Sequence, residues 1–286
     1  MRKYFLSCGF ALLVSLLLAT GASAMGKSRT AALQIGLHAK GTYRGTIDGV
    51  WGPATERAVR DLQRRARIPV DGVPGRQTRR ALGRYGRPGF GTRVIRSGHV
   101  GWDVSQLQFL LAWHGFPSGP LDGAFGPRTA AAVRGFQRWA RIGIDGVPGP
   151  ATLRALRGPL PRAGVRLAWP VVIPPTDGFG PRGNRFHTGL DFPARHGVPV
   201  AAAAVGRVIV AGRDGGGYGN LVVVRHAGGV YTWYAHLAAI AVRRGAFVGA
   251  GARIGTVGAT GHATGPHLHF EVRVRGAATD PLAALG

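Results

Sequence analysis

Cysteine is nearly absent from this sequence: Cys8 is the only one among 286 residues, and it lies in the N-terminal segment, before most of the apolar run of that segment. If that segment is removed, the mature protein contains no cysteine. It then has neither a disulfide framework nor a metal site built from thiolates. Any zinc ion must be held by imidazole and carboxylate groups, so the search for a metal site is limited to those side chains.

Acidic residues are also scarce, since 12 Asp and Glu face 37 Lys and Arg and give a formal net charge of +25. The excess is greatest in residues 25–165, with 23 basic and 7 acidic side chains, against 12 and 5 in residues 166–286. The basic helical stretches lack interleaved aromatic side chains, so we expect no nucleic-acid partner. The charge indicates either a solvated arginine-rich surface or attraction to anionic polymers.

The first 24 residues have the pattern of a signal peptide. Arg2 and Lys3 precede an apolar run from Phe10 to Leu18, and the small residues Ala22–Ala24 provide a cleavage site. An uncleaved membrane anchor is the alternative, but it needs about 20 apolar residues. We therefore expect residues 1–24 to be removed and the protein to be secreted, extracellular or periplasmic, without a membrane partner after cleavage.

A long internal repeat follows. Leu33 to Leu82 aligns without gaps with Leu107 to Leu156, and roughly half of the positions are identical. Both copies carry turn sequences of the type expected around helices, because Asp-Gly favours turns and Pro favours a first helical turn. The turn sequences are D-G-x-x-G-P-x-T at Asp48–Thr55 and Asp122–Thr129, and D-G-V-P-G at Asp71–Gly75 and Asp145–Gly149.

These repeats resemble the peptidoglycan-binding-1 domain. Its hallmark is a D-G-x-x-G-x-x-T turn followed by a helix that ends near Phe-Gln, here Phe136-Gln137, with Leu62-Gln63 in the first copy. The resemblance implies a three-helix module that binds wall glycan or stem peptide and has no catalytic role. The sequence does not identify the ligand residues of the repeats.

One helix face in each repeat is basic. At 100° per residue, the arginines of the first copy lie opposite Val59, Leu62 and Ala66. This stripe could attract anionic wall polymers, or it is an ordinary solvated face. The arginines are Arg57, Arg60, Arg64 and Arg67, with Arg134, Arg138 and Arg141 in the second copy.

From Leu167 onward, short β-rich runs alternate with Gly-rich turns, which predicts an antiparallel sheet. The clearest runs are Val205–Val210, Asn220–Arg225 and Val230–Tyr234. The expected division is a signal peptide at 1–24, a first repeat at 28–84, a linker at 85–98, a second repeat at 99–157, a linker at 158–166 and a β-sheet domain at 167–286.

Two histidine motifs lie in this last domain, H-T-G-L-D at His187–Asp191 and H-L-H at His267–His269. Even spacing on a strand places side chains on one face, so each pair can point into the same cleft. Catalytic zinc is usually held by three protein ligands and a water, and histidine with carboxylate is a suitable set. Spacing alone does not select which three of the four groups bind.

The domain resembles the lysostaphin-type zinc endopeptidases from about Trp169 to Pro281. The motifs that carry the resemblance are F-G-P-R, H-T-G-L-D, Y-A-H-L and G-P-H-L-H-F-E, in this order. It implies one zinc ion bound by His187, Asp191 and His269. It also implies that His236 and His267 act beside the metal as acid/base and transition-state-stabilising groups.

Further residues near these motifs have weaker assignments. Arg182, Tyr218 and Asn220 are family-like features of the loops around the cleft, where they orient substrate or maintain the fold. His226 is interpreted as structural. The remaining histidines are placed outside the site, namely His38, His99, His114, His196 and His262.

The expected fold class is thus multidomain α + β, with two small three-helix bundles followed by a mostly antiparallel β-sheet peptidase domain. The expected function is secreted zinc endopeptidase, hydrolysing peptide bonds in peptidoglycan crosslinks or bridges and anchored to the wall by the repeats. One alternative is a non-catalytic, wall-binding regulator of other peptidoglycan hydrolases. Another is a wall-binding adhesin or scaffold.

Overall fold

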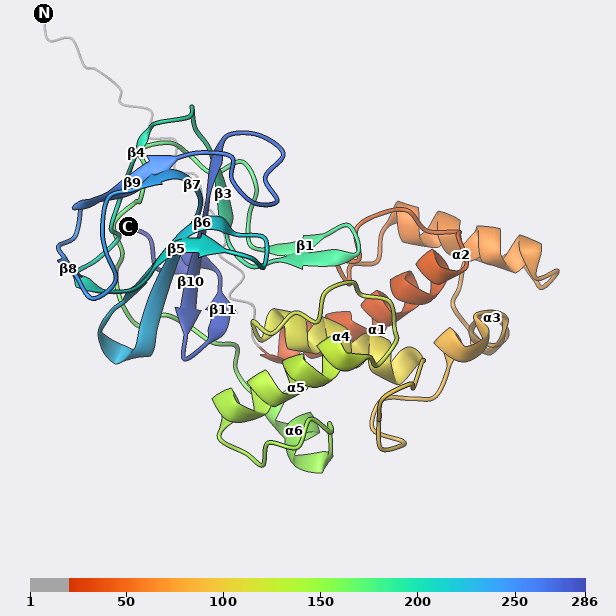
Figure 1. Cartoon of the computed structure of the whole chain (residues 1–286). Helices are drawn as coiled ribbons and strands as arrows, with labels where there is room; N and C mark the ends of the chain where they lie inside the picture. Colours follow the sequence, from red (N-terminus) through yellow and green to blue (C-terminus); the bar gives the residue numbers. More distant parts are fainter. Residues whose placement is uncertain (1–20) are drawn as a thin grey trace, which may run out of the picture.

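The computed structural model describes residues 21–286, which form a helical part and a β-sheet part (Figure 1). The expected signal peptide, residues 1–24, lies almost entirely outside the described residues. Within residues 21–286, none of the helices has both the length and the hydropathy of a membrane span.

The helical part contains the same three-helix arrangement twice, as the repeats predict. The first helices of the two copies, α1 and α4, pack against each other, so the two bundles share a central contact. Phe109 of α4 belongs to the apolar core of the first bundle, and Ala24 of α1 belongs to that of the second. The helices are α1 (Gly21–Ala39), α2 (Pro53–Arg65), α3 (Arg76–Ala81), α4 (Trp102–Trp113), α5 (Pro127–Ala140) and α6 (Pro150–Ala155).

A buried glutamine organises each turn sequence. The amide nitrogen of Gln63 donates to Asp71 Oδ1 at 2.7 Å and to Thr78 Oγ1 at 3.0 Å, while its oxygen accepts from the Gly72 amide at 2.9 Å. Asp71 Oδ1 also accepts from the Val73 amide. The buried polar groups of Gln63, Gly72 and Thr78 are therefore satisfied within the loop. Equivalent networks surround Gln34, Gln108 and Gln137.

These four networks show that the two kinds of turn sequence are one structural unit. Both continue to a threonine seven positions after the aspartate, at Thr78 and Thr152 in the D-G-V-P-G loops. Each repeat thus contains the unit twice. Its Asp, Gly, Gln and Thr residues are explained by the fold.

The arginine stripe on α2 differs from its prediction at one end. The helix ends at Arg65, and Arg67 lies beyond it with a left-handed φ of 53°. Two of the remaining arginines are paired on their own helix, Arg60 with Glu56 at 2.9 Å and Arg64 with Asp61 at 2.8 Å. Because these pairs are exposed, they contribute little to stability.

The β-sheet part is antiparallel, as expected. Its main path runs β11-β10-β7-β6-β5-β8, with β3 paired to β10, and β9 paired to β4 and β7. Strands β1 and β2 form a separate hairpin. The strands are β1 (Gly180–Arg182), β2 (Arg185–His187), β3 (Leu190–Pro193), β4 (Pro199–Ala201), β5 (Gly206–Asp214), β6 (Gly219–Arg225), β7 (Val230–Ile240), β8 (Phe247–Val248), β9 (Arg253–Val257), β10 (His267–Val274) and β11 (Ala277–Thr279).

Strand β10 divides the core from the candidate site. Its Leu268, Phe270 and Val272 are buried in the main core of the sheet. The alternate residues, beginning with His267 and His269, point to the opposite face because side chains alternate along a strand. The pattern of this one strand therefore places a histidine pair above a packed apolar layer.

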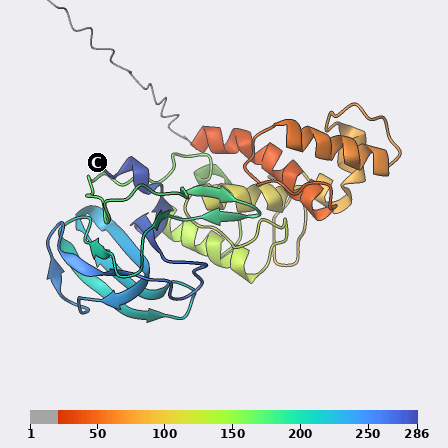
Figure 2. The same ribbon diagram turned by 90° about the horizontal axis from the view of Figure 1, so that it is seen from above.

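The β1–β2 hairpin leaves the sheet and reaches toward the helical part (Figure 1). The view from above shows the same hairpin lying alongside the helices (Figure 2). Two backbone hydrogen bonds join it to the repeats, from Ile47 to Gly183 and from Leu121 to Asn184. The two parts of the molecule therefore meet at the hairpin that ends in His187.

Candidate active site

Three strands and one hairpin end bring the expected site residues together. His187 ends β2, Asp191 lies on β3, His236 on β7, and His267 and His269 on β10. Asp191 and His269 are direct register partners in the β3–β10 ladder. All five line one cleft of about 440 Å³.

Three of these residues form a compact set of possible metal ligands. His187 Nε2 lies 3.1 Å from Asp191 Oδ1 and 3.1 Å from His269 Nδ1, and the latter two atoms are 2.8 Å apart. Tetrahedral zinc with bonds of about 2.05 Å to nitrogen and oxygen requires ligand atoms about 3.3 Å apart. The triangle therefore has nearly the dimensions that zinc needs.

The outward hydrogen bonds of the two imidazoles favour the same conclusion. His187 Nδ1 lies 2.8 Å from the carbonyl of Gly178, and His269 Nε2 lies 3.0 Å from Glu271 Oε1. Each acceptor favours a proton on the outward nitrogen, which leaves a lone pair on the inward one. Two lone pairs and a carboxylate oxygen then face one another. Such an arrangement requires a cation between them.

Without a bound metal ion, a proton supplies that cation. Burial disfavours the charged form of His269, but Asp191 and Glu271 outweigh this effect and raise its pKa to about 9. Burial likewise opposes ionisation of Asp191, yet His187, His269 and Arg182 hold the pKa of its carboxyl far below the usual range. The site is therefore built to concentrate positive charge.

A buried ion pair supports His269 from behind. Glu271 is fully buried, and its other oxygen accepts from Arg273 Nε at 2.6 Å. Burial alone would raise the pKa of Glu271, but Arg273 and His269 hold it well below its usual range. Glu271 thus orients the imidazole as an ionised carboxylate.

Glu271 and Arg273 were not among the predicted site residues. They continue the even spacing of His267 and His269 along β10, so all four side chains share one face. This periodicity is the sequence signal that could have identified them.

His236 and His267 lie beside the triangle with their rings 4.8 Å apart. The Nδ1 atoms face carbonyl oxygens, that of Thr260 at 2.7 Å and that of Gly265 at 2.9 Å. These contacts favour protons on Nδ1 and leave Nε2 available to the cleft. His267 Nε2 lies 3.9 Å from Asp191 Oδ1. Burial lowers the pKa of His236.

Arg182 binds the second oxygen of Asp191, with Nη2 at 2.8 Å from Oδ2, and also pairs with Asp177. It therefore orients a candidate ligand as well as lining the cleft. Its guanidinium is half-exposed, which leaves room for a further anionic contact.

The other two loop residues lie in different surroundings. Tyr218 lines the cleft, but its hydroxyl donates to Glu271 at 2.8 Å and accepts from Arg273 at 2.9 Å. Asn220 donates to the carbonyls of Leu237 and Ala238 and does not line this cleft. Its contacts support the strand rather than the cleft.

The histidines that were set aside separate into two groups. His226 is buried and bonded to Val205 and Thr232, and His114 is buried in the second helical bundle, consistent with structural roles. His262, by contrast, is an exposed residue that lines the cleft. A Gly-rich loop brings His262 to the cleft, and the local sequence does not predict the course of that loop.

Comparisons with known proteins divide the chain in the same way. The model of peptidase family M23 matches residues 185–281, and that of the putative peptidoglycan binding domain matches residues 27–82 and 101–156.

Several curated proteins are similar to about a third of the chain. DD-carboxypeptidase/endopeptidase Mpg of Neisseria meningitidis is 51% identical over 98 residues, which cover 34% of this chain and 22% of Mpg. Peptidoglycan DD-endopeptidase ShyB of Vibrio cholerae is 40% identical over 116 residues, covering 38% of this chain and 27% of ShyB. The match thus spans about a quarter of these relatives.

Among solved structures, the catalytic domain of lysostaphin from Staphylococcus simulans is 35% identical, with a TM-score of 0.36, over 38% of this chain and 90% of that domain. The family matches account for both parts of the molecule. The chain therefore carries a peptidase family M23 domain behind two domains of the putative peptidoglycan-binding family.

Proposed function

We propose that this protein is a secreted, zinc-dependent endopeptidase that hydrolyses peptide bonds in the crosslinks or bridges of peptidoglycan. In this proposal His187, Asp191 and His269 bind one zinc ion, and His236 and His267 serve the proton transfers. The observation that carries it is the triangle of three inward-facing acceptor atoms, 2.8–3.1 Å apart, within a domain of a metallopeptidase family.

The donor set fits the chemistry of peptide hydrolysis. A bound zinc ion would polarise the scissile carbonyl and make an attacking water acidic. His236 is neutral near pH 7 because burial lowers its pKa, so its Nε2 is suited to accept a proton from that water. His267, beside Asp191, would stabilise the negative charge that develops on the carbonyl oxygen by donating a hydrogen bond from Nε2 as an imidazolium.

The same proposal assigns a function to each of the other parts of the chain. Residues 1–24 export the protein, and the two repeats hold it on peptidoglycan, with anionic wall polymers as secondary partners of the arginine stripes. Support comes from the family match of the repeats and from relatives whose names include peptidoglycan endopeptidase activity. A location in the cell envelope follows from these assignments.

Digestion of purified sacculi tests the activity. The mature protein loaded with zinc should release new amino groups, and mass spectrometry of the products should identify the bond that is cleaved. His187→Ala should abolish release and zinc binding. His196→Ala removes an exposed histidine outside the cleft and should retain both. An inactive wild type that binds zinc would overturn the proposal.

The alternative, a non-catalytic regulator, makes the opposite prediction. If the protein were a regulator, the His187→Ala variant would stimulate a partner amidase to the same extent as the wild type, because this action would not need the metal. The complete ligand set and the two neighbouring imidazoles favour the enzyme, since a regulator has no requirement for either.

A further inference from the structure

The second repeat is joined to the peptidase domain by direct contacts. The amide of Ala278 on β11 donates to the carbonyl of Gly115 at 3.2 Å. Trp113 packs edge-on against Phe186 of the hairpin, with ring centroids 5.4 Å apart. Arg275 lies over the ring of Trp139 at 5.6 Å. The repeat and the sheet therefore form a continuous surface at this place.

The two repeats differ in sequence at the positions that make this surface. Trp113, Phe116 and Trp139 of the second copy align with Ala39, Thr42 and Arg65 of the first. At these three positions, large aromatic side chains occur only in the second copy, which is also the copy that contacts β11. This divergence is expected if the contact between the second repeat and the peptidase domain has a function other than binding to the cell wall.

Both repeats also hold the tip of the β1–β2 hairpin. The amides of Ile47 and Leu121, which occupy equivalent positions in the two copies, donate to the carbonyls of Gly183 and Asn184 at 2.8 and 2.7 Å. Arg185 follows directly, so its backbone is fixed by contacts with both repeats.

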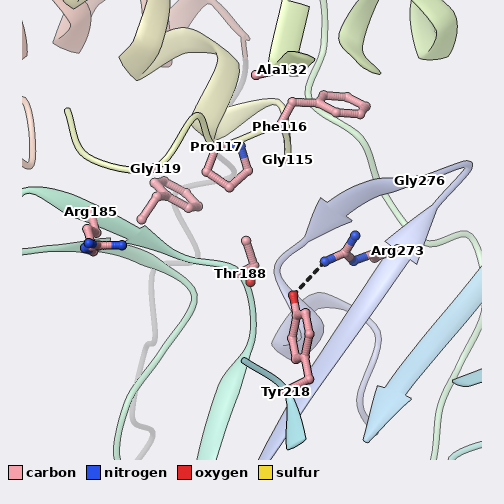
Figure 3. A pocket seen from close by; sticks show the side chains of 11 residues that line it. Gly115, Phe116, Pro117, Gly119, Ala132, Arg185, Thr188, Tyr218, Arg273 and Gly276 are labelled. Carbon is pink, nitrogen blue, oxygen red and sulfur yellow. Dashed lines mark hydrogen bonds between the residues drawn. The ribbon is translucent and has the colours of Figure 1, made fainter. Parts of the chain in front are cut away.

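A cavity of about 400 Å³ lies between the second repeat and the peptidase domain (Figure 3). Phe116 and Pro117 form one side, and Arg185, Thr188 and Tyr218 form part of the other. The last three residues also line the metal cleft. The two spaces therefore share a wall, and an extended molecule can occupy both.

The charge of this cavity is positive. Arg185 is exposed, and among residues 21–286 no side chain forms an ion pair with it. Arg273 also lines the cavity, but Glu271 already neutralises it. No acidic residue within the described part of the chain lines the cavity. Arg185 is therefore the group that would attract a ligand, and its guanidinium suits a carboxylate.

We propose that this cavity is a substrate subsite, in which Arg185 binds a free carboxylate of the peptidoglycan stem peptide while the adjoining residues occupy the metal cleft. The second repeat supplies the apolar wall of the subsite. The inference rests on the proposed function for its substrate class. It adds that the second repeat takes part in substrate selection.

Equilibrium binding separates this inference from catalysis. Two ligands are compared. The first is a set of soluble crosslinked muropeptides with free carboxylates. The second is the same set after carbodiimide coupling with ammonia, which converts the carboxylates into amides. Chelator-treated full-length mature protein avoids turnover. It should bind the free carboxylates at least about tenfold more tightly, the usual effect of a charge-assisted hydrogen bond. Arg185→Gln should remove that preference.

Variants of the repeats test the contribution of the second copy. Gly115 and Gly41 occupy equivalent positions with φ of +82° and +70°. A Cβ at Gly115 would overlap the backbone of Ala278, whereas one at Gly41 meets open space. Both alanine substitutions impose similar local strain. Gly115→Ala should therefore reduce the carboxylate preference several-fold, and Gly41→Ala should retain it.

Phe116→Thr covers the case in which Gly115→Ala does not fold. It installs the residue that the first copy carries at Thr42 and should also weaken the preference. Equal binding of both ligands by the wild type, or an unchanged preference in Arg185→Gln, would overturn the subsite. Carboxylate preference without cleavage by zinc-loaded protein would remove the proposed activity and leave the subsite standing. Cleavage by zinc-loaded protein without a preference for free carboxylates would overturn the subsite and leave the proposed activity standing.

Discussion

The turn loops of the repeats and the cleft of the peptidase domain both gather polar side chains, but they satisfy them in opposite ways. In the loop around Gln63, each donor of the amide meets an acceptor, and its oxygen meets a backbone amide. In the cleft, His187, Asp191 and His269 direct three acceptor atoms toward one point. The loop is complete by itself, whereas the cleft requires a cation.

This difference separates structural from functional polar residues without reference to any relative. A network whose members satisfy one another stabilises the fold, because removing one member leaves buried groups unpaired. A cluster of converging acceptors does not stabilise the fold by itself and points to a ligand. Changes in the two regions should therefore have separable effects, and the following experiments test that separation.

The largest loss of activity is expected when one of the proposed metal ligands is removed. His269→Ala removes one of three metal ligands and should lower the rate on sacculi by at least about 1,000-fold, with loss of zinc from the protein. Zinc content by atomic absorption and the rate of amine release measure both effects. His226→Ala, a buried histidine outside the cleft, should retain zinc. Equal zinc loss in the two variants would break the comparison.

Substitution of the neighbouring histidines should lower the activity without the additional loss of zinc. His236→Gln and His267→Gln should each lower kcat by about 100- to 10,000-fold, the range for lost acid/base groups. Zinc content should stay at one ion per molecule because neither residue belongs to the triangle. If either variant lost its zinc, the residue would have to be counted as a ligand instead.

Substitutions in the turn loops should change the free energy of unfolding rather than the rate of hydrolysis. Gln63→Ala leaves buried partners unsatisfied and should lower the free energy of unfolding by about 2 to 3 kcal/mol, measured by urea titration. Gln77→Ala, at an exposed glutamine of the same repeat, is the control and should change it little. Hydrolysis of a small soluble peptide should be unchanged in both. Reduced turnover in folded Gln63→Ala would contradict a purely structural role.

The smallest effect is expected for zinc binding when the pH changes by a single unit. The pKa of His269 is raised to about 9, so below that pH a proton must leave before the metal binds. Zinc affinity should then fall by about tenfold for each pH unit below 9 and level off above it. Competition with a chelator between pH 6 and 10 measures this slope. An affinity that is constant from pH 6 to 8 would show that His269 is already deprotonated there.

Several features of the molecule could be predicted from sequence because they depend on short-range patterns. The duplication, the helical class of the repeats and the antiparallel sheet follow from turn sequences and periodicity, and the structure confirms them. Even spacing correctly predicted that His267 and His269 would share a face of β10. His187 and Asp191, by contrast, lie on two strands, β2 and β3, and converge because the chain bends between them. The identity of the three possible ligands came from the resemblance to a family, because spacing left four candidates.

Other features depend on contacts between distant segments. Glu271 lies two residues from His269, yet its role arises from Arg273, Tyr218 and the burial of the whole group. Asn220 and Tyr218 were grouped together, although strand pairing directs one to backbone carbonyls and the other to the cleft. His262 reaches the cleft through a loop whose course the sequence does not reveal.

The sequence by itself limited the composition of the candidate site, because a chain whose one cysteine is Cys8 leaves imidazole and carboxylate groups as the candidate metal ligands. It also determined the repeated helical architecture, because helices and turns are encoded within a few residues. Only the tertiary structure decided that the second repeat forms a wall beside the cleft. That arrangement depends on hydrogen bonds and aromatic contacts between residues far apart in the chain, which no local pattern encodes.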